Sequence, residues 1–187
     1  MYDADTNPST AWIGAGSYGT PEISPEAWLA PGAIVTGNVR IGAESSVWYG
    51  SVLRADSDDI ALGWRCNVQD QCCLHTDPGE PAILGDRVSL GHKAMVHGAR
   101  VQDGALIGIG AIVLSGATVG AGALVAAGAL VGPGKHVPSG VLFAGVPGRV
   151  VRELTEEDRA SFADTPEKYL ELARAHAQTR WSTEQGS

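Results

Sequence analysis

Residues 101–137 read VQDGALIGIGAIVLSGATVGAGALVAAGALVGPGKHV and repeat with a period of six. A branched aliphatic residue, here called an anchor, recurs at every sixth position: Val101, Ile107, Val113, Val119, Val125, Val131 and Val137. A small residue, usually alanine, stands four positions after most anchors, and glycines lie between them. A period of six fits neither the 3.6-residue turn of an α-helix nor the two-residue alternation of a strand. The pattern predicts a parallel β-helix of hexapeptide repeats, in which three hexads close one triangular coil.

The same period continues toward the N terminus. Its anchors there are Ile23, Leu29, Val35, Ile41, Val47 and Leu53. The pattern resembles that of the left-handed β-helix proteins. We therefore expect an all-β solenoid, a left-handed parallel β-helix over residues 23–146, with a C-terminal α-helix packed alongside. An N-terminal extension over residues 1–22 and a C-terminal helical segment over residues 147–187 complete the expected organisation.

The composition of the chain excludes several classes of function. Its 187 residues suit one domain, and 13 Lys and Arg against 21 Asp and Glu give a net charge of −8. A negative chain has the wrong sign for holding nucleic acid or an anionic membrane surface. Residues 104–134 carry no charge, but their nine regularly spaced glycines argue against a membrane-spanning helix.

Cysteine usage and the first residues predict a cytoplasmic protein. There are three cysteines, and Cys72 and Cys73 are adjacent, which is a poor basis for a disulfide framework. Residues 1–10, MYDADTNPST, have no basic region followed by an apolar run, so we expect no secretory signal there. Cys66 and Cys72 fall at the small-residue positions of the repeat and are expected to fill the core.

The repeat is interrupted twice near its middle. The step between anchors lengthens to nine residues after Leu53 and to ten residues after Leu74. We expect two short loops, at residues 55–61 and 76–82, on neighbouring coils. Loops inserted on one side of a solenoid commonly form its functional face.

Counting three hexads to a coil brings two histidines together. His75 and His97 each directly follow an anchor of the same face on consecutive coils, and Arg54 holds this position one coil earlier. The anchors of that face are Val35, Leu53, Leu74, Val96 and Val113. Stacked parallel strands lie about 4.8 Å apart. Two nitrogens on one tetrahedral zinc, each about 2.1 Å from it, must lie only a few ångströms apart. The register therefore permits one metal ion to bind both histidines.

His92 lies on the preceding face, in the outward position that Tyr49 and Asp70 occupy on earlier coils. The anchors of that face are Val47, Val68, Leu90 and Ile107. Three chains packed side by side can bring the His75 and His97 column of one chain against His92 of the next. Three imidazoles with an open fourth position for water are typical of a catalytic zinc site.

The other charged and titratable residues receive plainer interpretations. His136 and His176 are expected to be solvated surface side chains. Two interpretations are open for Asp56, Asp58 and Asp59, which either belong to a charged loop or take part in the site.

Residues 147–187 change to helix-type spacing. Thr155 is a plausible N-cap followed three residues later by Asp158, and a second helix is expected to start at Thr165, with Pro166 in its first turn. We expect these helices to cover one flank of the solenoid.

Three segments make the chain resemble a known family. SVLRADSDD at residues 51–59, CNVQDQCCLH at 66–75 and SLGHKAMVHGARV at 89–101 are similar to segments of the γ-class carbonic anhydrases and their bacterial homologues. By this resemblance, the three metal ligands are matched by His75, His92 and His97. The Arg-x-Asp motif of the family is matched by Arg54 and Asp56, and its Asn-x-Gln-Asp motif by Asn67, Gln69 and Asp70.

The resemblance implies a homotrimeric lyase, a carbonate dehydratase that reversibly hydrates carbon dioxide to bicarbonate. Its metal, Zn2+ or alternatively Fe2+ or Co2+, is held between two subunits and lowers the pKa of a bound water to about 7, and the resulting hydroxide attacks carbon dioxide. The resemblance assigns catalytic roles to Asp56, Asn67 and Gln69, whose two amides are candidates for orienting hydroxide or bicarbonate. Arg54 and Asp70 are expected to pair across the subunit interface.

The segment after the first histidine departs from the prototype of that family. The prototype has a longer acidic loop there, with a glutamate that shuttles protons. Here the segment is only residues 76–82, and Glu80 is its one glutamate. The resemblance is therefore to a short-loop subgroup, for which we expect detectable but modest hydration.

Two other functions stay open at this point. Hexapeptide-repeat relatives include acyltransferases and acyl-CoA thioesterases, which need a cleft for a pantetheine arm and a histidine acting as base. The chain lacks the long extruded loop that those transferases usually carry. A noncatalytic assembly subunit would keep the coil without needing three histidines.

Overall fold

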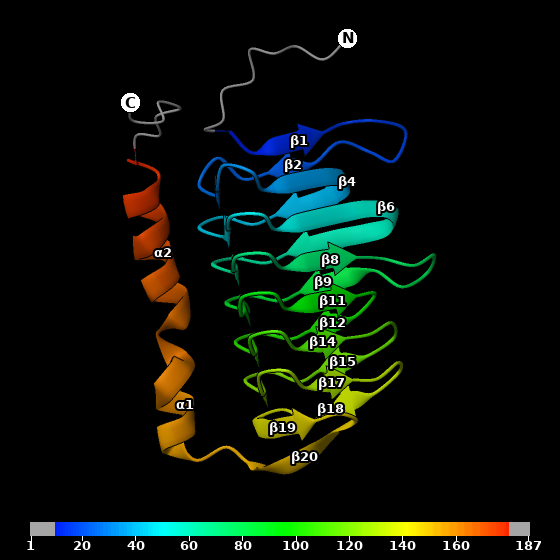
Figure 1. Cartoon of the computed structure of the whole chain (residues 1–187), viewed down its shortest axis with the longest axis vertical. Helices are drawn as coiled ribbons and strands as arrows, with labels where there is room; N and C mark the ends of the chain where they lie inside the picture. Colours follow the sequence, from blue (N-terminus) through cyan, green and yellow to red (C-terminus); the bar gives the residue numbers. More distant parts are fainter. Residues whose placement is uncertain (1–9, 180–187) are drawn as a thin grey trace, which may run out of the picture.

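The computed structural model describes residues 10–179, which form a left-handed parallel β-helix with two helices along one flank (Figure 1). The expected fold class is confirmed. The strands are β1 (Trp12–Gly14), β2 (Glu22–Ile23), β3 (Trp28–Leu29), β4 (Ile34–Ile41), β5 (Ser46–Val47), β6 (Val52–Leu62), β7 (Asn67–Val68), β8 (Cys73–His75), β9 (Ala82–Leu84), β10 (Ser89–Leu90), β11 (Met95–His97), β12 (Arg100–Val101), β13 (Leu106–Ile107), β14 (Ile112–Val113), β15 (Thr118–Val119), β16 (Leu124–Val125), β17 (Leu130–Val131), β18 (His136–Val137), β19 (Val141–Gly145) and β20 (Gly148–Glu153). The helices are α1 (Glu156–Ala163) and α2 (Thr165–His176).

Two sheets make the three faces of the coil. A 12-stranded sheet covers two of them, because the long strand β6 pairs with β8 on one side and with β9 on the other. We call the side formed by β8, β11, β14 and β17 the histidine face. The third side is an 8-stranded sheet running from β3 to β20, and we call it the helix face.

The anchors stack as the period of six predicts. Leu53 pairs with Leu74, Leu74 with Val96, and Val96 with Val113, all in parallel register. These side chains are fully buried, and the alanines at the corners of the coil are buried with them. Because a one-residue slip would turn every anchor outward, this apolar ladder fixes the register of each coil on the next.

Serines and cysteines replace alanine at some corners and remain buried. The Ser51 hydroxyl donates to the Gln69 carbonyl at 2.7 Å and accepts from the Cys72 amide at 3.1 Å. Burial raises the pKa of the Cys66 and Cys72 thiols to about 12. Both cysteines therefore fill the core as expected, as neutral thiols.

The expected loop at residues 55–61 is wrong, because these residues continue β6. Ala55, Ile60 and Leu62 are buried, so the extra residues lengthen the strand around the corner of the coil instead of leaving it. Gly37 of β4 makes this possible. Its φ is +84°, and a Cβ there would meet the carbonyl oxygen of Ala55 at 1.9 Å. The second expected loop, at residues 76–82, does leave the coil, as a tight turn closed by bridge pairing of Asp77 with Glu80.

Strands lie beyond both expected boundaries of the coil. β1 and β2 pair with β4, so the sheet begins before residue 23. At the other end β20 folds back antiparallel on β19, within the segment expected to be helical. Residues 1–9 and 180–187 of the expected terminal segments lie outside the described residues.

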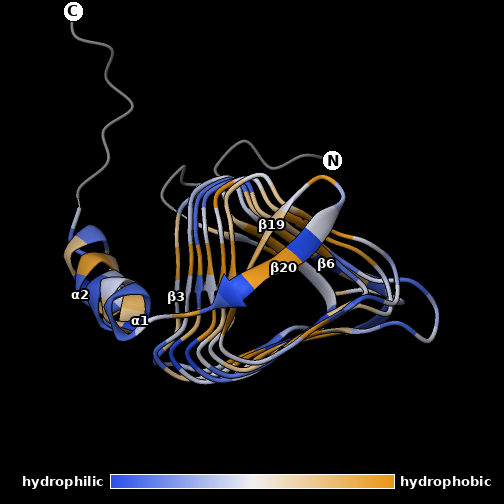
Figure 2. Cartoon of the chain, turned by 90° about the horizontal axis from the view of Figure 1, so that it is seen from below, coloured by the Kyte–Doolittle hydropathy of each residue, from blue (hydrophilic) through white to orange (hydrophobic). Residues whose placement is uncertain are grey.

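The C-terminal helices begin where the sequence predicts. The Thr155 side chain accepts from the Asp158 amide and Asp158 returns the contact, which is a capping box for α1. α2 starts at Thr165 with Pro166 in its first turn. Seen along the coil axis, both helices lie beside the strand β3 and the rest of the helix face (Figure 2).

Aromatic residues dock the end of α2. The His176 ring accepts or donates a hydrogen bond at 2.8 Å between Nδ1 and the Tyr49 hydroxyl, and its centroid lies 5.0 Å from that of Trp48. Trp48 also meets the edge of Tyr169. The expectation of a solvated His176 is therefore wrong, because α2 carries it onto the helix face. His136 is exposed, as expected.

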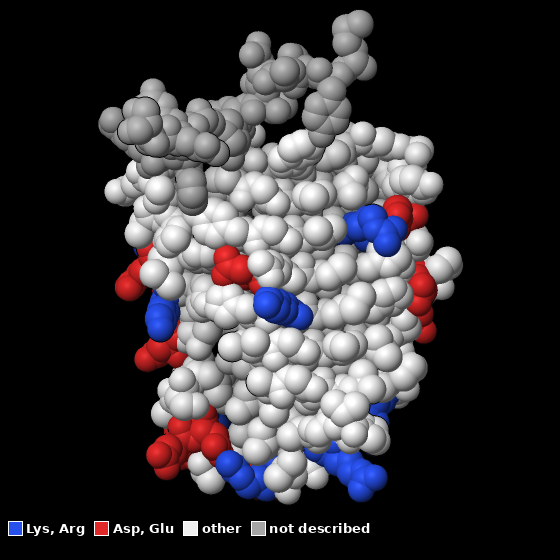
Figure 3. Space-filling model, in the orientation of Figure 1, with Lys and Arg blue, Asp and Glu red and all other residues white. Residues whose placement is uncertain are grey.

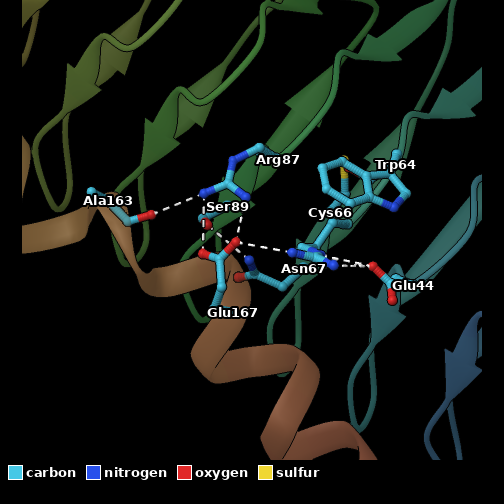
Figure 4. A network of polar contacts seen from close by, with 9 residues as sticks. Glu44, Trp64, Cys66, Asn67, Arg87, Ser89, Ala163 and Glu167 are labelled. Carbon is cyan, nitrogen blue, oxygen red and sulfur yellow. Dashed lines mark hydrogen bonds and ion pairs between the residues drawn. The ribbon is translucent and has the colours of Figure 1, made fainter.

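A polar network holds the start of α2 (Figure 4). Glu167 accepts from Arg87 at 3.1 Å and from Arg65 at 3.2 Å, and Arg65 also pairs with Glu44. Arg65 and Arg87 have φ of +53° and +58°, in the left-handed region. Gly104 occupies the corresponding corner one coil further on, with φ of +64°. The strained arginines thus occur where a side chain is needed to hold α2.

On the side seen in Figure 3 acidic and basic side chains are scattered, and several lie next to one another. No helix within residues 10–179 has both the length and the apolarity needed to cross a membrane.

Replacing Glu167 by Gln should weaken the docking of α2 at neutral pH. The hydrogen bond from Arg87 is the main cause that lowers the pKa of Glu167 from 4.5 to about 2. A lowered folded-state pKa stabilises the fold above the unfolded value, and this stabilisation disappears as the pH falls through about 2. We expect the difference in melting temperature between wild type and E167Q to be constant from about pH 7 to about pH 5 and to vanish toward pH 2. Near-ultraviolet circular dichroism, which follows the packing of aromatic side chains such as Trp48 and Tyr169, measures it.

The matched control is Glu171→Gln, which removes an exposed carboxylate from the same helix. A difference for E167Q that does not depend on pH, or an equal effect of E171Q, would contradict the role of the Arg87 contact.

Candidate metal centre

His75 and His97 face each other on neighbouring strands of the histidine face. Their Cα atoms pair in register, and because side chains alternate along a strand, the preceding anchors point inward while both imidazoles point outward. His75 Nδ1 lies 3.0 Å from His97 Nε2, and the ring centroids are 4.9 Å apart. Both side chains are partly buried, at 17% and 21% exposure. The expected histidine column is therefore present within one chain.

Asp56 and Arg54 extend this cluster along β6. Asp56 Oδ1 lies 2.9 Å from His75 Nε2, and Arg54 contacts the other carboxylate oxygen. The hydrogen bond with His75, followed by that with Arg54, lowers the pKa of Asp56. An ionised carboxylate only accepts hydrogen bonds, so His75 carries its proton on Nε2. In the neutral ring, Nδ1 then has a lone pair directed at His97.

The His97 ring is held from the opposite side. His97 Nδ1 lies 3.0 Å from the Ser115 hydroxyl oxygen, and Ser115 donates to Asp77 Oδ2 at 2.8 Å. Sequence reasoning missed Ser115 and Asp77. Ser115 stands two residues after the anchor Val113, as Thr76 does after Leu74, and this shared offset was the available signal.

His92 lies apart from this pair, at the edge of the helix face. Its Nδ1 is 2.8 Å from Asp70 Oδ2, and its Nε2 is 3.3 Å from the Tyr169 hydroxyl of α2. The side chain is 41% exposed. Tyr169 was also missed, because nothing in the six-residue period places a helix residue against a coil.

The two amides of the predicted site, Asn67 and Gln69, lie on the helix face, beneath α2. Gln69 Nε2 donates to Asn67 Oδ1 at 3.0 Å, and Asn67 Nδ2 donates to Ser89 at 2.8 Å. Asn67 is 1% exposed and Gln69 is 6% exposed. Within residues 10–179 no hydrogen bond joins either amide to His75 or His97.

The remaining acidic residues take structural contacts. Asp59 pairs with Arg40 at 2.8 Å, and Asp58 accepts the Gly79 amide at 2.9 Å. Asp58 thus fixes the turn at residues 76–82, and neither carboxylate contacts a histidine in the described part of the chain. Of the pair expected at a subunit interface, Arg54 contacts Asp56 and Asp70 contacts His92 in the single chain.

The histidine pair fits two of the ligands of a divalent transition metal. Two nitrogens bound to one tetrahedral ion at about 2.0–2.1 Å lie roughly 3.3–3.4 Å apart, and the observed separation is 3.0 Å. Imidazole suits zinc, iron and cobalt. Within residues 10–179 no group of three or more His, Cys, Asp or Glu side chains could hold a metal ion. One chain therefore offers two of the three expected ligands together and His92 separately.

The chain is similar to proteins named carbonic anhydrases and to a solved structure. No protein-family model matches the chain. The Methanocaldococcus jannaschii protein named "Probable carbonic anhydrase" is 54% identical over 151 residues, which cover 81% of this chain and 95% of that protein. "Gamma carbonic anhydrase 1, mitochondrial" of Arabidopsis thaliana is 42% identical over 84% of this chain and 59% of the plant protein, less than two thirds of its length. A solved Bacillus cereus structure with a provisional acetyltransferase assignment superposes with a TM-score of 0.89 at 40% identity, over 91% of this chain and 100% of that chain.

Replacing His75 or His97 by Gln should abolish zinc retention without unfolding the coil, because both side chains point away from the core. We expect wild type to keep about one zinc per chain after dialysis and each variant to keep almost none. Elemental analysis measures the zinc, and circular dichroism checks the fold. His136→Gln, which alters an exposed histidine on β18, is the control and should retain zinc. Equal zinc in all four proteins would contradict the assignment.

Proposed function

The chain belongs to the γ carbonic anhydrase family, and on this premise we propose that it catalyses the reversible hydration of carbon dioxide to bicarbonate. The proposed centre is a metal site formed by His75 and His97 of one chain with His92 of a second copy. The observation that carries the proposal is the 3.0 Å approach of His75 Nδ1 to His97 Nε2, on a face where both rings are directed outward. The carbonic anhydrase names of relatives at 42% and 54% identity support the reaction.

The metal would be Zn2+, with Fe2+ or Co2+ as alternatives that imidazole also binds. When bound, such an ion supplies a nucleophilic hydroxide near neutral pH by lowering the pKa of water to about 7. The chain's own residues prepare the ligands. Asp56 keeps the proton of His75 on Nε2, and Arg54 holds Asp56 in place through the second carboxylate oxygen.

Asn67 and Gln69 have different proposed roles, because they differ in burial. Asn67 is almost fully buried and engaged with both Ser89 and Gln69, so it positions its neighbour. Gln69 retains slight exposure and is the member that would orient hydroxide or bicarbonate.

A homotrimer would bring the separated ligands together. The histidine face carries an apolar stripe beside the histidines, in which Met95 pairs with Cys73 and with Ile112. Ile112 is 38% exposed, and Ile109, which follows Ile107 as His92 follows Leu90, is 56% exposed. Apolar surface thus accompanies the ligands on both sides, as a subunit contact requires. Because the two surfaces differ, a head-to-tail ring is the closed assembly that uses both.

The acetyltransferase assignment of the Bacillus cereus structure supports a second candidate function, transfer or hydrolysis of an acyl group of coenzyme A. That chemistry needs a cleft for the pantetheine arm. The insertion at residues 76–82 leaves the coil, but it is short and closed on itself by Asp77 and Glu80, which favours carbon dioxide over an acyl thioester.

Carbon dioxide hydration should be detectable and modest in protein loaded with zinc or with iron. Stopped-flow measurement with a pH indicator tests this, with metal-stripped protein as the control. A rate equal to that of buffer with either metal, together with turnover of acyl-CoA by metal-free protein, would overturn the proposal in favour of the second candidate.

Mixed trimers of His92→Ala and His97→Ala chains test ligand sharing. Each homotrimer should lose all its sites, because every interface lacks one ligand. In a cyclic trimer, any mixture has a single junction where an intact His97 meets an intact His92. Fully mixed trimers should therefore recover up to about one third of the wild-type metal and activity.

The control mixture combines His75→Ala chains with His97→Ala chains. These two histidines belong to the same half of the site, the half that a single chain supplies. It should recover nothing, since no junction unites a complete pair with His92. Zero recovery from the first mixture, in trimers shown to be mixed by mass spectrometry, would rule out sharing between chains.

A further inference from the structure

The turn at residues 76–82 brings a carboxylate back over the histidine face. Bridge pairing between Asp77 and Glu80 closes the turn, and Asp58 accepts the Gly79 amide at 2.9 Å. The Thr76 hydroxyl, fully buried, also accepts the Asp58 amide at 3.0 Å. Three contacts thus fix the position from which the Asp77 side chain reaches the coil below.

Asp77 reaches His97 through one hydroxyl. Ser115, on the coil after His97, donates to Asp77 Oδ2 at 2.8 Å, and its oxygen lies 3.0 Å from His97 Nδ1. The same carboxylate oxygen is 3.5 Å from His97 Nδ1. Carboxylate, hydroxyl and imidazole therefore form a short chain that ends at the histidine pair.

Proton counting along this chain fixes the state of His97. A serine hydroxyl has one proton to donate, and Ser115 gives it to Asp77, which as a carboxylate only accepts. The Ser115 oxygen can then only accept from His97, so His97 carries its proton on Nδ1. A bare Nδ1 would instead place its lone pair toward a negative oxygen 3.5 Å away.

With the proton on Nδ1, His97 presents the lone pair of Nε2 to its neighbour. His75 presents the lone pair of Nδ1, because Asp56 holds its proton on Nε2. Two lone pairs 3.0 Å apart repel each other unless a cation or a proton lies between them. The two rings are thus held in opposite tautomers that both suit a shared metal.

We propose that Ser115 and Asp77 are positioning residues that hold His97 in the Nδ1-protonated tautomer and so direct Nε2 at the metal. This rests on the proposed function, in which a metal ion would lie between the two nitrogens. The turn is shorter than the acidic loop of the family prototype. It then has a role of its own, because it supplies the carboxylate that orients one ligand.

Glu80 provides a matched control within the same turn. It is an acidic residue like Asp77, but its carboxylate lies over Gly116, near enough that a Cβ there would be 3.4 Å from Oε1. Glu80→Gln therefore removes an equal charge from the turn and leaves the Ser115 contact in place.

The test compares Ser115→Ala, Asp77→Asn and Glu80→Gln with wild type in two measurements. Long-range ¹H–¹⁵N spectra of metal-free protein, recorded above the ordinary histidine pKa at about pH 8, report the tautomer of His97. Competition with a chelator reports the affinity for zinc. We expect S115A and D77N to lose the single Nδ1-protonated form and to bind zinc about 10- to 100-fold more weakly, while E80Q matches wild type.

Two further variants keep the test decisive. Ser115→Thr keeps a hydroxyl at this position and, unlike S115A, should retain the tautomer and most of the affinity for zinc. The double variant S115A/D77N should lose no more than either single variant, because the two residues act in series. The Asp77 side chain is 51% exposed, so D77N should fold and remains informative even where S115A fails to fold.

Each outcome has a separate meaning. Zinc binding by wild type with an unchanged tautomer in S115A and D77N overturns the inference and leaves the proposed function standing. A wild type that binds no zinc overturns the proposed function, while the spectra of metal-free protein still decide whether Ser115 and Asp77 set the tautomer. Equal weakening by E80Q would show a general effect of charge and would also overturn the inference.

Discussion

Main-chain hydrogen bonds between successive coils are the constraint on which the rest of this structure depends. The Met95 amide donates to Ala111 of the next coil at 2.9 Å, and the Gly98 amide donates to His75 of the preceding coil at 2.9 Å. Parallel pairing of this kind superposes equivalent positions about 4.8 Å apart. Slippage by one residue would expose every anchor, so the apolar ladder and the hydrogen bonds enforce the same register. The juxtaposition of His75 and His97 is a direct result of that register.

Features that depend only on the register could be predicted from the sequence. The period of six located the anchors, and counting hexads placed His75 and His97 in one column, where their Cα atoms pair. The prediction of a loop at residues 55–61 was wrong, because the sequence spacing is the same whether the extra residues lengthen a strand or form a loop beside it. Burial of Ala55 and Ile60 and the glycine at position 37 decide between them, and both depend on the neighbouring coil.

Contacts made by elements outside the repeat could not be predicted in this way. The docking of α2 places Tyr169 beside His92 and His176 beside Tyr49, and a helix has no period in common with the coil to reveal these pairs. The contact of Asp77 with Ser115 has the same character, because the direction of a turn is a tertiary property. The hexads therefore predicted the two facing histidines, while the groups that contact them required the three-dimensional structure.

A straight column of residues has a chemical limit that explains why His92 lies elsewhere. Positions along one face fall on a line, and a three-ligand tetrahedral site needs a donor off that line. The next members of the column are Arg54, which stays protonated, and Leu114, which has no donor atom, so the column offers two candidate ligands. His92, held by Asp70 and left 41% exposed, is directed off that line. If the third ligand comes from a second copy, metal binds only the assembled form, and by mass action the metal in turn stabilises the assembly. The geometry of a solenoid face thus couples the proposed chemistry to the packing of chains.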